Sequence, residues 1–546
     1  MASIDYSNKY FLVIDNIKPS HDVLKKFAMS LTTKPVDSTY YAQEVLPLCL
    51  EKQFDIVLLG YDLGEKQKNG QQLLEELRLS EVISRHCVVI MITAEVSQAM
   101  VLAALEHKPD NYLCKPYTVN DLKKRLDSCM KKKHAMASIY QALEEDNKSL
   151  VINLVDKALA RGTLYRAECL GIKSRQFYEL NNFEQAKKIY KLYQNEQNCM
   201  WANIGLGKIA IKEDELTQAV DIFKNLIELK PFYLPGYDWL ASTYVKKCNC
   251  ISAEETLEQA IRLSPRSVLR LKRFAQLCFD NKHFEKATSA YEKVYTLANN
   301  SIHHNPSNAI SYAKSLASYS SELPISDAKK LNVRAFSMLS QSNKSFNLPT
   351  LKIQTHLLSA CLLENTHDYV MAKDKIEQGM SLLDREEQNI DANTLRSIAS
   401  SLTMLKRNSK ASQLISSAEQ QQNSSEADNT PAATKIGELS SEQLNDNYAI
   451  KAQKALTAGK DLYESKQYDE SIKSLNNALL LFPTHNGIKL NLLQVLLGTF
   501  ENDNVKTYAL KQAKKLILDL INISATDNEY IRLKKMKKKY QQLAGI

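Results

Sequence analysis

The chain has 546 residues, more than one hydrophobic core usually supports, so its length predicts several domains or a domain followed by a repeat array. Its 14 glycines and 13 prolines are too few for a turn-rich β architecture, and no apolar run approaches the roughly 18 residues of a membrane span. Ten cysteines without paired spacing exclude a disulfide framework and indicate a reducing cytoplasm. The net charge of +9 is mild for this length.

Short apolar runs alternate with amphipathic stretches through the first quarter of the chain. We expect strands at residues 10–15, 55–60, 87–93 and 111–117, and helices at 71–79, 96–106 and 119–130. Alternation of strand and helix predicts a parallel, doubly wound sheet with helices on both faces. We therefore predict an α/β domain over residues 1–133.

Polar residues stand at the ends of three of the four expected strands and Gly60 at the end of the fourth, and in a doubly wound sheet functional groups gather at these carboxyl ends. The strand ends carry Asp15-Asn16, Gly60, Thr93 and Lys115-Pro116. This set resembles the receiver domain of bacterial response regulators. That family has an acidic pair after strand one, a phosphoacceptor aspartate after strand three, Thr or Ser after strand four, and Lys-Pro after strand five. The resemblance implies a flavodoxin-like fold with a five-stranded parallel sheet.

The resemblance also implies phosphoryl chemistry, because acidic side chains bind Mg²⁺, the aspartate attacks phosphorus, and Lys and a hydroxyl bind the product oxygens. Thr93 and Lys115 match the family, and Tyr112 occupies the position of its aromatic switch. Asn16, however, replaces an acidic residue. Asp15 is left as the one candidate Mg²⁺ ligand, and we expect weak binding and no resident cofactor.

Two positions compete for the place of the phosphoacceptor. Gly60 lies five residues after Asp55, which is the family's spacing from the first residue of the strand. Asp62 lies eight residues before Gly70, which is the family's spacing to the next helix. We favour Gly60, because "GYDLG" resembles the "DYNLG" of tetratricopeptide-containing receivers. The domain is then predicted not to accept phosphate in the usual way; a working phosphorelay receiver that uses Asp62 is the alternative.

Residues 134–165 are predicted to form a helical connector. Between Tyr117 and Gly162 there is no proline or glycine, so the last helix of the α/β domain is expected to continue with little interruption. Such a helix would either transmit a conformational change or serve as inert packing, and the sequence does not distinguish these two roles.

Residues 166–301 contain a repeat of 34 residues. Equivalent positions are large and apolar (Leu206, Leu240, Phe274), small (Gly207, Ala241, Ala275) or alanine (Ala219, Ala253, Ala287). This period and pattern are typical of the tetratricopeptide repeat (TPR), in which each helical hairpin is stable only against its neighbours. The sequence therefore predicts an all-α TPR solenoid, and the whole chain resembles bacterial TPR-containing response regulators.

The remainder divides into three predicted segments. Residues 302–407 are expected to form degenerate helical repeats, and residues 408–447, rich in Ser, Gln and Asn, a flexible linker. Residues 448–546 contain a further TPR-like copy and end in the basic run "RLKKMKKKYQQ". A solvated helix end explains that run better than nucleic-acid binding, because no recognition helix or aromatic platform accompanies it.

The first helix of each TPR hairpin lines the concave face of a solenoid. The residues expected there include Trp201, Lys208, Lys212, Lys246 and Lys272, against only two acidic residues. Such a groove suits a protein or peptide with carboxylates and apolar anchors. No sequence pattern of an enzyme, a metal site or a nucleotide-binding loop is present. We therefore predict a non-enzymatic, cytoplasmic signalling adaptor of the two-component type, with a homodimer contact through receiver residues 96–130.

Overall fold

The computed structural model of the chain describes residues 4–64, 67–94, 102, 106, 109–196, 198–426 and parts of 462–544. Two compact units, Met1–Ser441 and Glu442–Ile546, make up the chain, and each is described by itself. Within the described residues, no helix combines the length and the apolar character that a membrane crossing requires.

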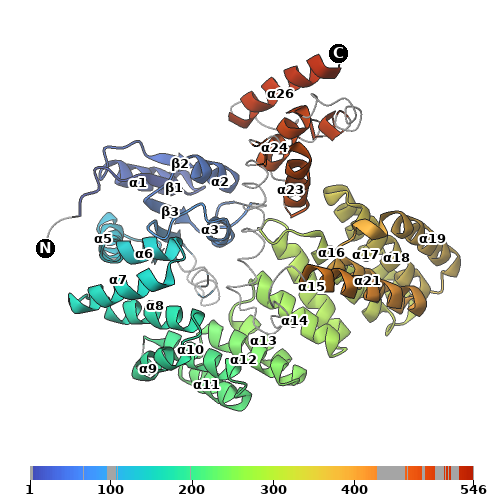
Figure 1. The fold of residues 1–546 in the computed structure, drawn as a ribbon, viewed down its shortest axis with the longest axis horizontal. Helices are drawn as coiled ribbons and strands as arrows, with labels where there is room; N and C mark the ends of the chain where they lie inside the picture. Colours follow the sequence, from blue (N-terminus) through green and yellow to red (C-terminus); the bar gives the residue numbers. More distant parts are fainter. Residues whose placement is uncertain are drawn as a thin grey trace. The chain divides into compact units, whose positions relative to one another are not determined.

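The first unit begins with an α/β domain built on a five-stranded parallel sheet (Figure 1). The strand order is β2-β1-β3-β4-β5, with β1 at Phe11–Ile14, β2 at Asp37–Thr39, β3 at Ile56–Gly60, β4 at Val88–Thr93 and β5 at Asn111–Cys114. Its described helices include α1 (Lys18–Met29), α2 (Ala42–Glu51), α3 (Gly70–Leu79) and α5 (Val119–Ala135). The prediction of a doubly wound parallel sheet is confirmed.

Each face of the sheet carries its own hydrophobic core. Alternate strand residues, such as Leu12 and Val57, pack with α2 and α3, whereas their neighbours, such as Val13 and Leu58, pack with α1 and α5. Both faces are covered, as a parallel sheet requires. The short strand β2 is absent from the runs expected from sequence, because its three residues "DST" show no apolar pattern.

The connector is interrupted, which corrects the expectation of a near-continuous helix. Helix α5 ends at Ala135 and is followed by α6 (Ala137–Glu144) and α7 (Lys148–Ala160). The turn between α6 and α7 has Asp146 in the left-handed region (φ 48°), and Asn147 caps α7. Aspartate and asparagine tolerate such turns better than most residues, so this break needs neither glycine nor proline.

Residues 166–298 form four helical hairpins (Figure 1). Their helices are α8 (Arg166–Glu179), α9 (Phe183–Tyr193), α10 (Met200–Lys212), α11 (Leu216–Leu229), α12 (Leu234–Lys246), α13 (Cys250–Leu263), α14 (Val268–Asp280) and α15 (Phe284–Ala298). Each hairpin turns at a left-handed residue that is not glycine, namely Asn181, Asp214, Cys248 and Lys282. These turns recur every 33 or 34 residues, so the predicted all-helical array is confirmed together with its period.

Six further α-helices and the short 3-10 helix η1 (Glu387–Asn389) complete the described part of the first unit. The α-helices are α16 (Pro306–Ser320), α17 (Ile325–Phe346), α18 (Pro349–Asn365), α19 (Tyr369–Glu386), α20 (Ala392–Met404) and α21 (Asn408–Glu426). Helix α21 corrects the linker prediction over residues 408–426, because Ala411, Leu414 and Ala418 are buried at helical spacing in this polar segment. The rest of the predicted linker lies outside the described residues.

The second unit contains α23 (Tyr468–Leu481), α24 (Asn486–Gly498) and α26 (Asn528–Ala544). Leu475 of the predicted C-terminal repeat is buried with Leu493 of α24 and Leu533 of α26 in one hydrophobic cluster. The basic run near the C-terminus lies on α26. This run is therefore part of a helix whose Leu533 and Met536 are buried within the second unit.

Close approach between helices depends on small residues in the array. A Cβ atom on Gly207 of α10 would lie 2.2 Å from the ring of Phe223 on α11, and Phe223 is fully buried. A Cβ on Gly236 of α12 would instead meet Ile227 at 3.2 Å, where a small shift suffices. The array thus tolerates an added methyl group at Gly236 better than at Gly207.

We predict that Gly207→Ala destabilises the array by about 1–3 kcal/mol, because the added methyl group overpacks a filled contact. Gly236→Ala is the matched control and is expected to change stability by less than about 1 kcal/mol. The far-UV circular dichroism signal during thermal unfolding measures both. Equal midpoints for the two variants would contradict the packing argument.

Candidate functional site

The polar strand-end residues meet at one edge of the sheet. Asp15 follows β1, Gly60 ends β3, Thr93 ends β4 and Lys115 follows β5. Parallel pairing of these four strands places their carboxyl ends next to one another. The backbone N–H of Lys115 donates to the carbonyl oxygen of Thr93 at 2.7 Å. The residues expected from sequence to form a pocket therefore do lie at the same edge.

Asp15 is the central acidic group of this pocket and is only 1% exposed. Its Oδ2 accepts from Lys115 Nζ at 3.0 Å and from Ser20 Oγ at 2.6 Å, and its Oδ1 accepts from the backbone N–H of Ile17 at 2.9 Å. Burial, and secondly the negative charge of Asp15, raise the pKa of Tyr117 to about 12. The carboxylate is thus already engaged by a cation, a hydroxyl and a backbone amide.

Gly60 and Asp62 occupy different surroundings. A Cβ on Gly60 would lie 3.3 Å from both Cα and Cγ of Asp15, so a side chain at this position would point at the buried carboxylate. Asp62 is exposed, and its Oδ1 accepts from the backbone N–H of Gly64 at 3.0 Å within the loop. The position that faces the pocket is therefore the one held by glycine.

The remaining predicted residues lie around this centre. Thr93 is buried, whereas Tyr112 is half-buried and packs against the core on the α2 and α3 face. The side chain of Asn16 approaches Gly64, which has a left-handed φ of 105°. Sequence reasoning missed Ser20 and Tyr117, although Ser20 lies one helical turn into α1 and Tyr117 directly follows the Lys-Pro pair.

These residues do not fit a magnesium site. Mg²⁺ is usually held by one or two free carboxylates together with water and substrate phosphate. Here Asp15 is the one carboxylate at the strand ends and binds Lys115, Asn16 is neutral, and Gly60 offers no ligand. Throughout the part of the chain that the structure describes, no cluster of three or more His, Cys, Asp or Glu residues has a metal-binding arrangement.

The lysines expected in the TPR groove are distributed over α10, α12 and α14. Lys208 Nζ lies 4.5 Å from the ring centroid of Tyr178 and 5.2 Å from that of Trp239. Lys246 Nζ donates to the carbonyl oxygen of Ile211 at 2.9 Å. These two ammonium groups are therefore held by named partners and are not freely mobile surface charges.

The other expected groove residues differ in their surroundings. Lys212 and Lys272 are exposed, and desolvation lowers the pKa of Lys272. Trp201 is half-buried beside Tyr190 and Tyr193, with ring centroids 6.0 and 5.5 Å away. Packing within the array thus accounts for Trp201, while the four lysines supply positive charge.

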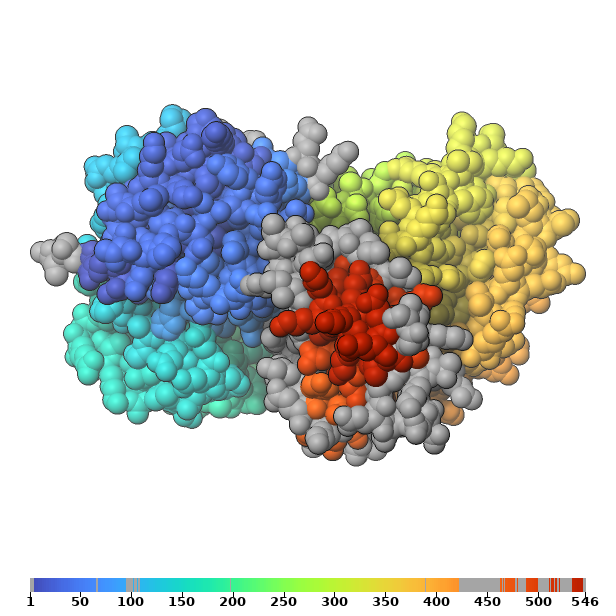
Figure 2. Space-filling model, turned by 90° about the horizontal axis from the view of Figure 1, so that it is seen from above, coloured from blue at the N-terminus to red at the C-terminus, as the bar shows by residue number. Residues whose placement is uncertain are grey.

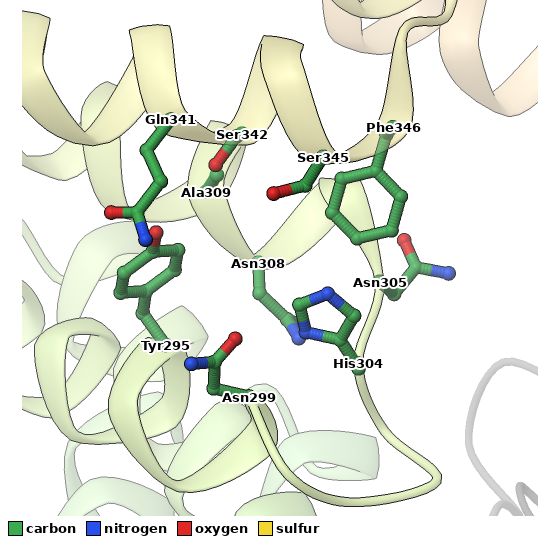
Figure 3. A pocket seen from close by; sticks show the side chains of 10 residues that line it. All are labelled: Tyr295, Asn299, His304, Asn305, Asn308, Ala309, Gln341, Ser342, Ser345 and Phe346. Carbon is green, nitrogen blue, oxygen red and sulfur yellow. The ribbon is translucent and has the colours of Figure 1, made fainter. Parts of the chain in front are cut away.

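A small polar cavity lies between α15, α16 and α17 (Figure 3). Its volume is about 20 Å³, and His304, Asn308 and Gln341 are among the side chains that line it. His304 stacks on Phe346 with ring centroids 4.8 Å apart, and desolvation lowers its pKa. A single water molecule needs roughly 10–15 Å³ of such volume, so this cavity is too small for an organic ligand.

Comparison with known proteins identifies the first domain. The family model described as "Response regulator receiver domain" matches residues 11–127. Residues 11–127 form a response regulator receiver domain. "Chemotaxis protein CheY-3" of Vibrio cholerae is 27% identical over 127 residues, which cover 23% of this chain and 95% of that protein. "Chemotaxis protein CheY homolog" of Campylobacter jejuni is 29% identical over 119 residues, 22% of this chain and 90% of that protein.

Solved structures match the receiver domain and the helical region separately. A receiver domain titled "BeF3 Activated DrrB Receiver Domain" covers 22% of this chain and 97% of its own length, with 20% identity and a TM-score of 0.20. The C-terminal part of a TPR repeat-containing protein from Cytophaga hutchinsonii covers 51% of this chain and 98% of its own length, with 18% identity and a TM-score of 0.34.

We predict that Lys115→Met destabilises the receiver domain by about 1–3 kcal/mol, because the buried Asp15 carboxylate loses its cation. Lys9→Met is the matched control, since Lys9 pairs with Asp55 at 2.8 Å where both side chains are about one-third exposed. Such a surface pair contributes about 0–1 kcal/mol. Native-state hydrogen exchange of peptides from β1 and β5 measures the difference. An equal effect of the two substitutions would contradict the role given to the Asp15–Lys115 pair.

Proposed function

We propose that this protein is a non-enzymatic signalling adaptor of the two-component type, in which a receiver domain without a phosphoacceptor is joined to TPR repeats that bind a protein partner. The observation that carries the proposal is Gly60, which takes the position at the end of β3 that faces Asp15. A glycine there supplies no nucleophile for phosphoryl transfer. The receiver then serves as a fixed contact surface.

The charges of the pocket support the same conclusion. In a receiver that accepts phosphate, the lysine and the hydroxyl bind the oxygens of the phosphorylated aspartate. Here the Lys115 ammonium group binds Asp15 instead, at 3.0 Å. The remaining strand-end residues, Asn16 and Thr93, carry no charge. The pocket is thus electrically balanced without a phosphoryl group or a divalent cation.

The helical array supports protein binding as the output. Its hairpins recur at the 34-residue period of TPR proteins, and such arrays present an extended concave surface for peptides or helices. All ten cysteines are free thiols, which supports function in a reducing compartment such as the cytoplasm. The chemotaxis relatives cover less than a quarter of this chain, so we propose the type of signalling and not the pathway.

The homodimer expected through residues 96–130 stays a prediction. Two described residues of that surface, Leu102 and Glu106, contact helices of the same chain. Nucleic-acid binding through α26 has no support beyond the charge of its basic run. Protein binding through the TPR groove is therefore the function that the described residues support best.

The receiver domain is expected to remain unphosphorylated after incubation with acetyl phosphate and Mg²⁺, because Gly60 offers no nucleophile. Intact-protein mass spectrometry is expected to show no added phosphoryl group, either in the unmodified chain or in Asp62→Ala. A labile adduct that is present in the unmodified chain and absent in Asp62→Ala would contradict the proposal and favour a working phosphorelay receiver.

Reversal of the groove charge is expected to abolish capture of the natural partner. The variant carries Glu at Lys208, Lys212, Lys246 and Lys272 and should keep its helical circular dichroism signal. A matched control reverses four exposed lysines on the second helices of the hairpins, Lys188, Lys191, Lys224 and Lys293. Partner capture by the control and not by the groove variant supports the groove; equal capture by both would contradict it.

A further inference from the structure

A buried arginine of the array, Arg270, directs one of its guanidinium nitrogens at the receiver domain. Arg270 of α14 is 5% exposed, and its Nε and Nη2 donate to the two carboxylate oxygens of Asp238 on α12, each at 2.9 Å. This two-pronged contact fixes the plane of the guanidinium group. The remaining nitrogen, Nη1, is thereby oriented independently of any ligand.

Nη1 of Arg270 donates to Oε1 of Glu106 at 2.8 Å, and Glu106 belongs to the receiver domain. The two residues are 164 positions apart in the chain, and the Glu106 side chain is 15% exposed. Burial disfavours the charged form of Arg270, but the charges of Asp238 and Glu106 outweigh it and raise its pKa. The two carboxylates of Asp238 and Glu106 are therefore sufficient to keep Arg270 charged.

Leu102 accompanies Glu106 on the same side of the receiver segment, because both are helical and four residues apart. Leu102 packs against an apolar cluster formed by Leu234 and Tyr237 of α12 and Ala260 of α13. A leucine and a carboxylate of the receiver therefore enter adjoining apolar and cationic sites of the array.

A second set of contacts joins the receiver to the array near α3. Glu75 Oε1 lies 2.7 Å from His303 Nε2, and Gln72 Nε2 donates to the carbonyl oxygen of Leu297 at 3.1 Å. Two glutamates of the receiver, Glu75 and Glu106, thus meet basic side chains of the array. Figure 2 shows the blue receiver residues as one body that adjoins the cyan helices following it in the chain.

We propose that Arg270 and the apolar cluster beside it form a binding site for a helix carrying a leucine followed four residues later by a glutamate, and that the receiver's own Leu102 and Glu106 occupy it. This inference rests on the proposed function of the array as a protein-binding surface. An external partner with the same chemistry then competes with the receiver domain. By linkage, binding of such a partner favours release of the receiver segment from the array, and binding of the receiver segment to the array weakens partner binding to the same degree.

Occupation within the chain follows from effective concentration. The receiver is covalently joined to the array, so its segment competes as an intramolecular ligand whose effective concentration does not depend on the concentration of the protein. A free ligand of equal intrinsic affinity is therefore mostly excluded. Removing the receiver's side chains from the site exposes it without altering the array residues.

The test uses the full-length chain and a fluorescent peptide with the sequence of residues 96–108, VSQAMVLAALEHK. Fluorescence anisotropy is expected to show at least about tenfold tighter peptide binding to Leu102→Ala/Glu106→Gln than to the unmodified chain, because the internal competitor is weakened. A control peptide with glutamine in place of its glutamate should lose that gain. Equal binding by the unmodified chain and the double variant, or equal binding of the two peptides, would overturn the proposal.

Two variants test the array side of the contact. Arg270→Met leaves the buried Asp238 carboxylate without its cation, and this single variant can unfold for that reason. The double variant Asp238→Asn/Arg270→Met removes both charges and provides the test in that case. In the Leu102→Ala/Glu106→Gln background either variant should abolish peptide binding. Arg262→Met is the control, because Arg262 lies on α13 with a side chain 76% exposed. Retained peptide binding without Arg270 would overturn the site.

The outcomes also separate this inference from the proposed function. If reversal of the groove lysines abolishes capture of the natural partner while Leu102→Ala/Glu106→Gln leaves peptide binding unchanged, the adaptor function stands and occupation by the receiver is rejected. If the peptide results are as expected and partner capture is insensitive to the lysines, the internal site stands and the partner binds elsewhere.

Discussion

No helical hairpin of the array buries its apolar surface by itself, and this constraint governs most of the chain. The fully buried alanines Ala219, Ala253 and Ala287 allow the helices of successive hairpins to approach closely. Regular stacking then fixes which residues meet across neighbouring hairpins. Asp238 and Arg270 are 32 residues apart and form a two-pronged ion pair as a consequence of that stacking. The chemistry of the groove therefore depends on the packing of the array.

The receiver pocket keeps the architecture of its family while changing its charge balance. Parallel strands bring Asp15, Gly60, Thr93 and Lys115 to one edge, and there the ammonium group binds the single buried carboxylate. With glycine at the position facing Asp15, no second carboxylate competes for that lysine. A self-balanced pocket suits a domain whose surface, rather than its phosphorylation, provides the signal.

Polar contacts join the receiver domain to the helical array. Glu106 meets Arg270 and Glu75 meets His303, so acidic groups of the receiver face basic groups of the array. Under the proposal that the receiver occupies a binding site of the array, binding events on the two parts are coupled in free energy. Under the proposed function, a receiver without a phosphoacceptor regulates access to the array through its own Leu102 and Glu106 side chains.

The sequence by itself determined the features that depend on spacing along the chain. Short apolar runs alternating with helical patterns predicted the sheet domain, the strand-end residues predicted the pocket, and the 34-residue period predicted the helical hairpins. Local patterns were misleading where polar composition hid order: β2 has no apolar signal, and the buried residues of α21 lie within a Ser- and Gln-rich segment. Tertiary structure alone decided that Gly60 faces Asp15, that Ser20 shares its carboxylate, and that Arg270 binds both Asp238 and Glu106. These contacts join residues from different elements, and which side chains meet there depends on packing in three dimensions, which no periodicity along the chain encodes.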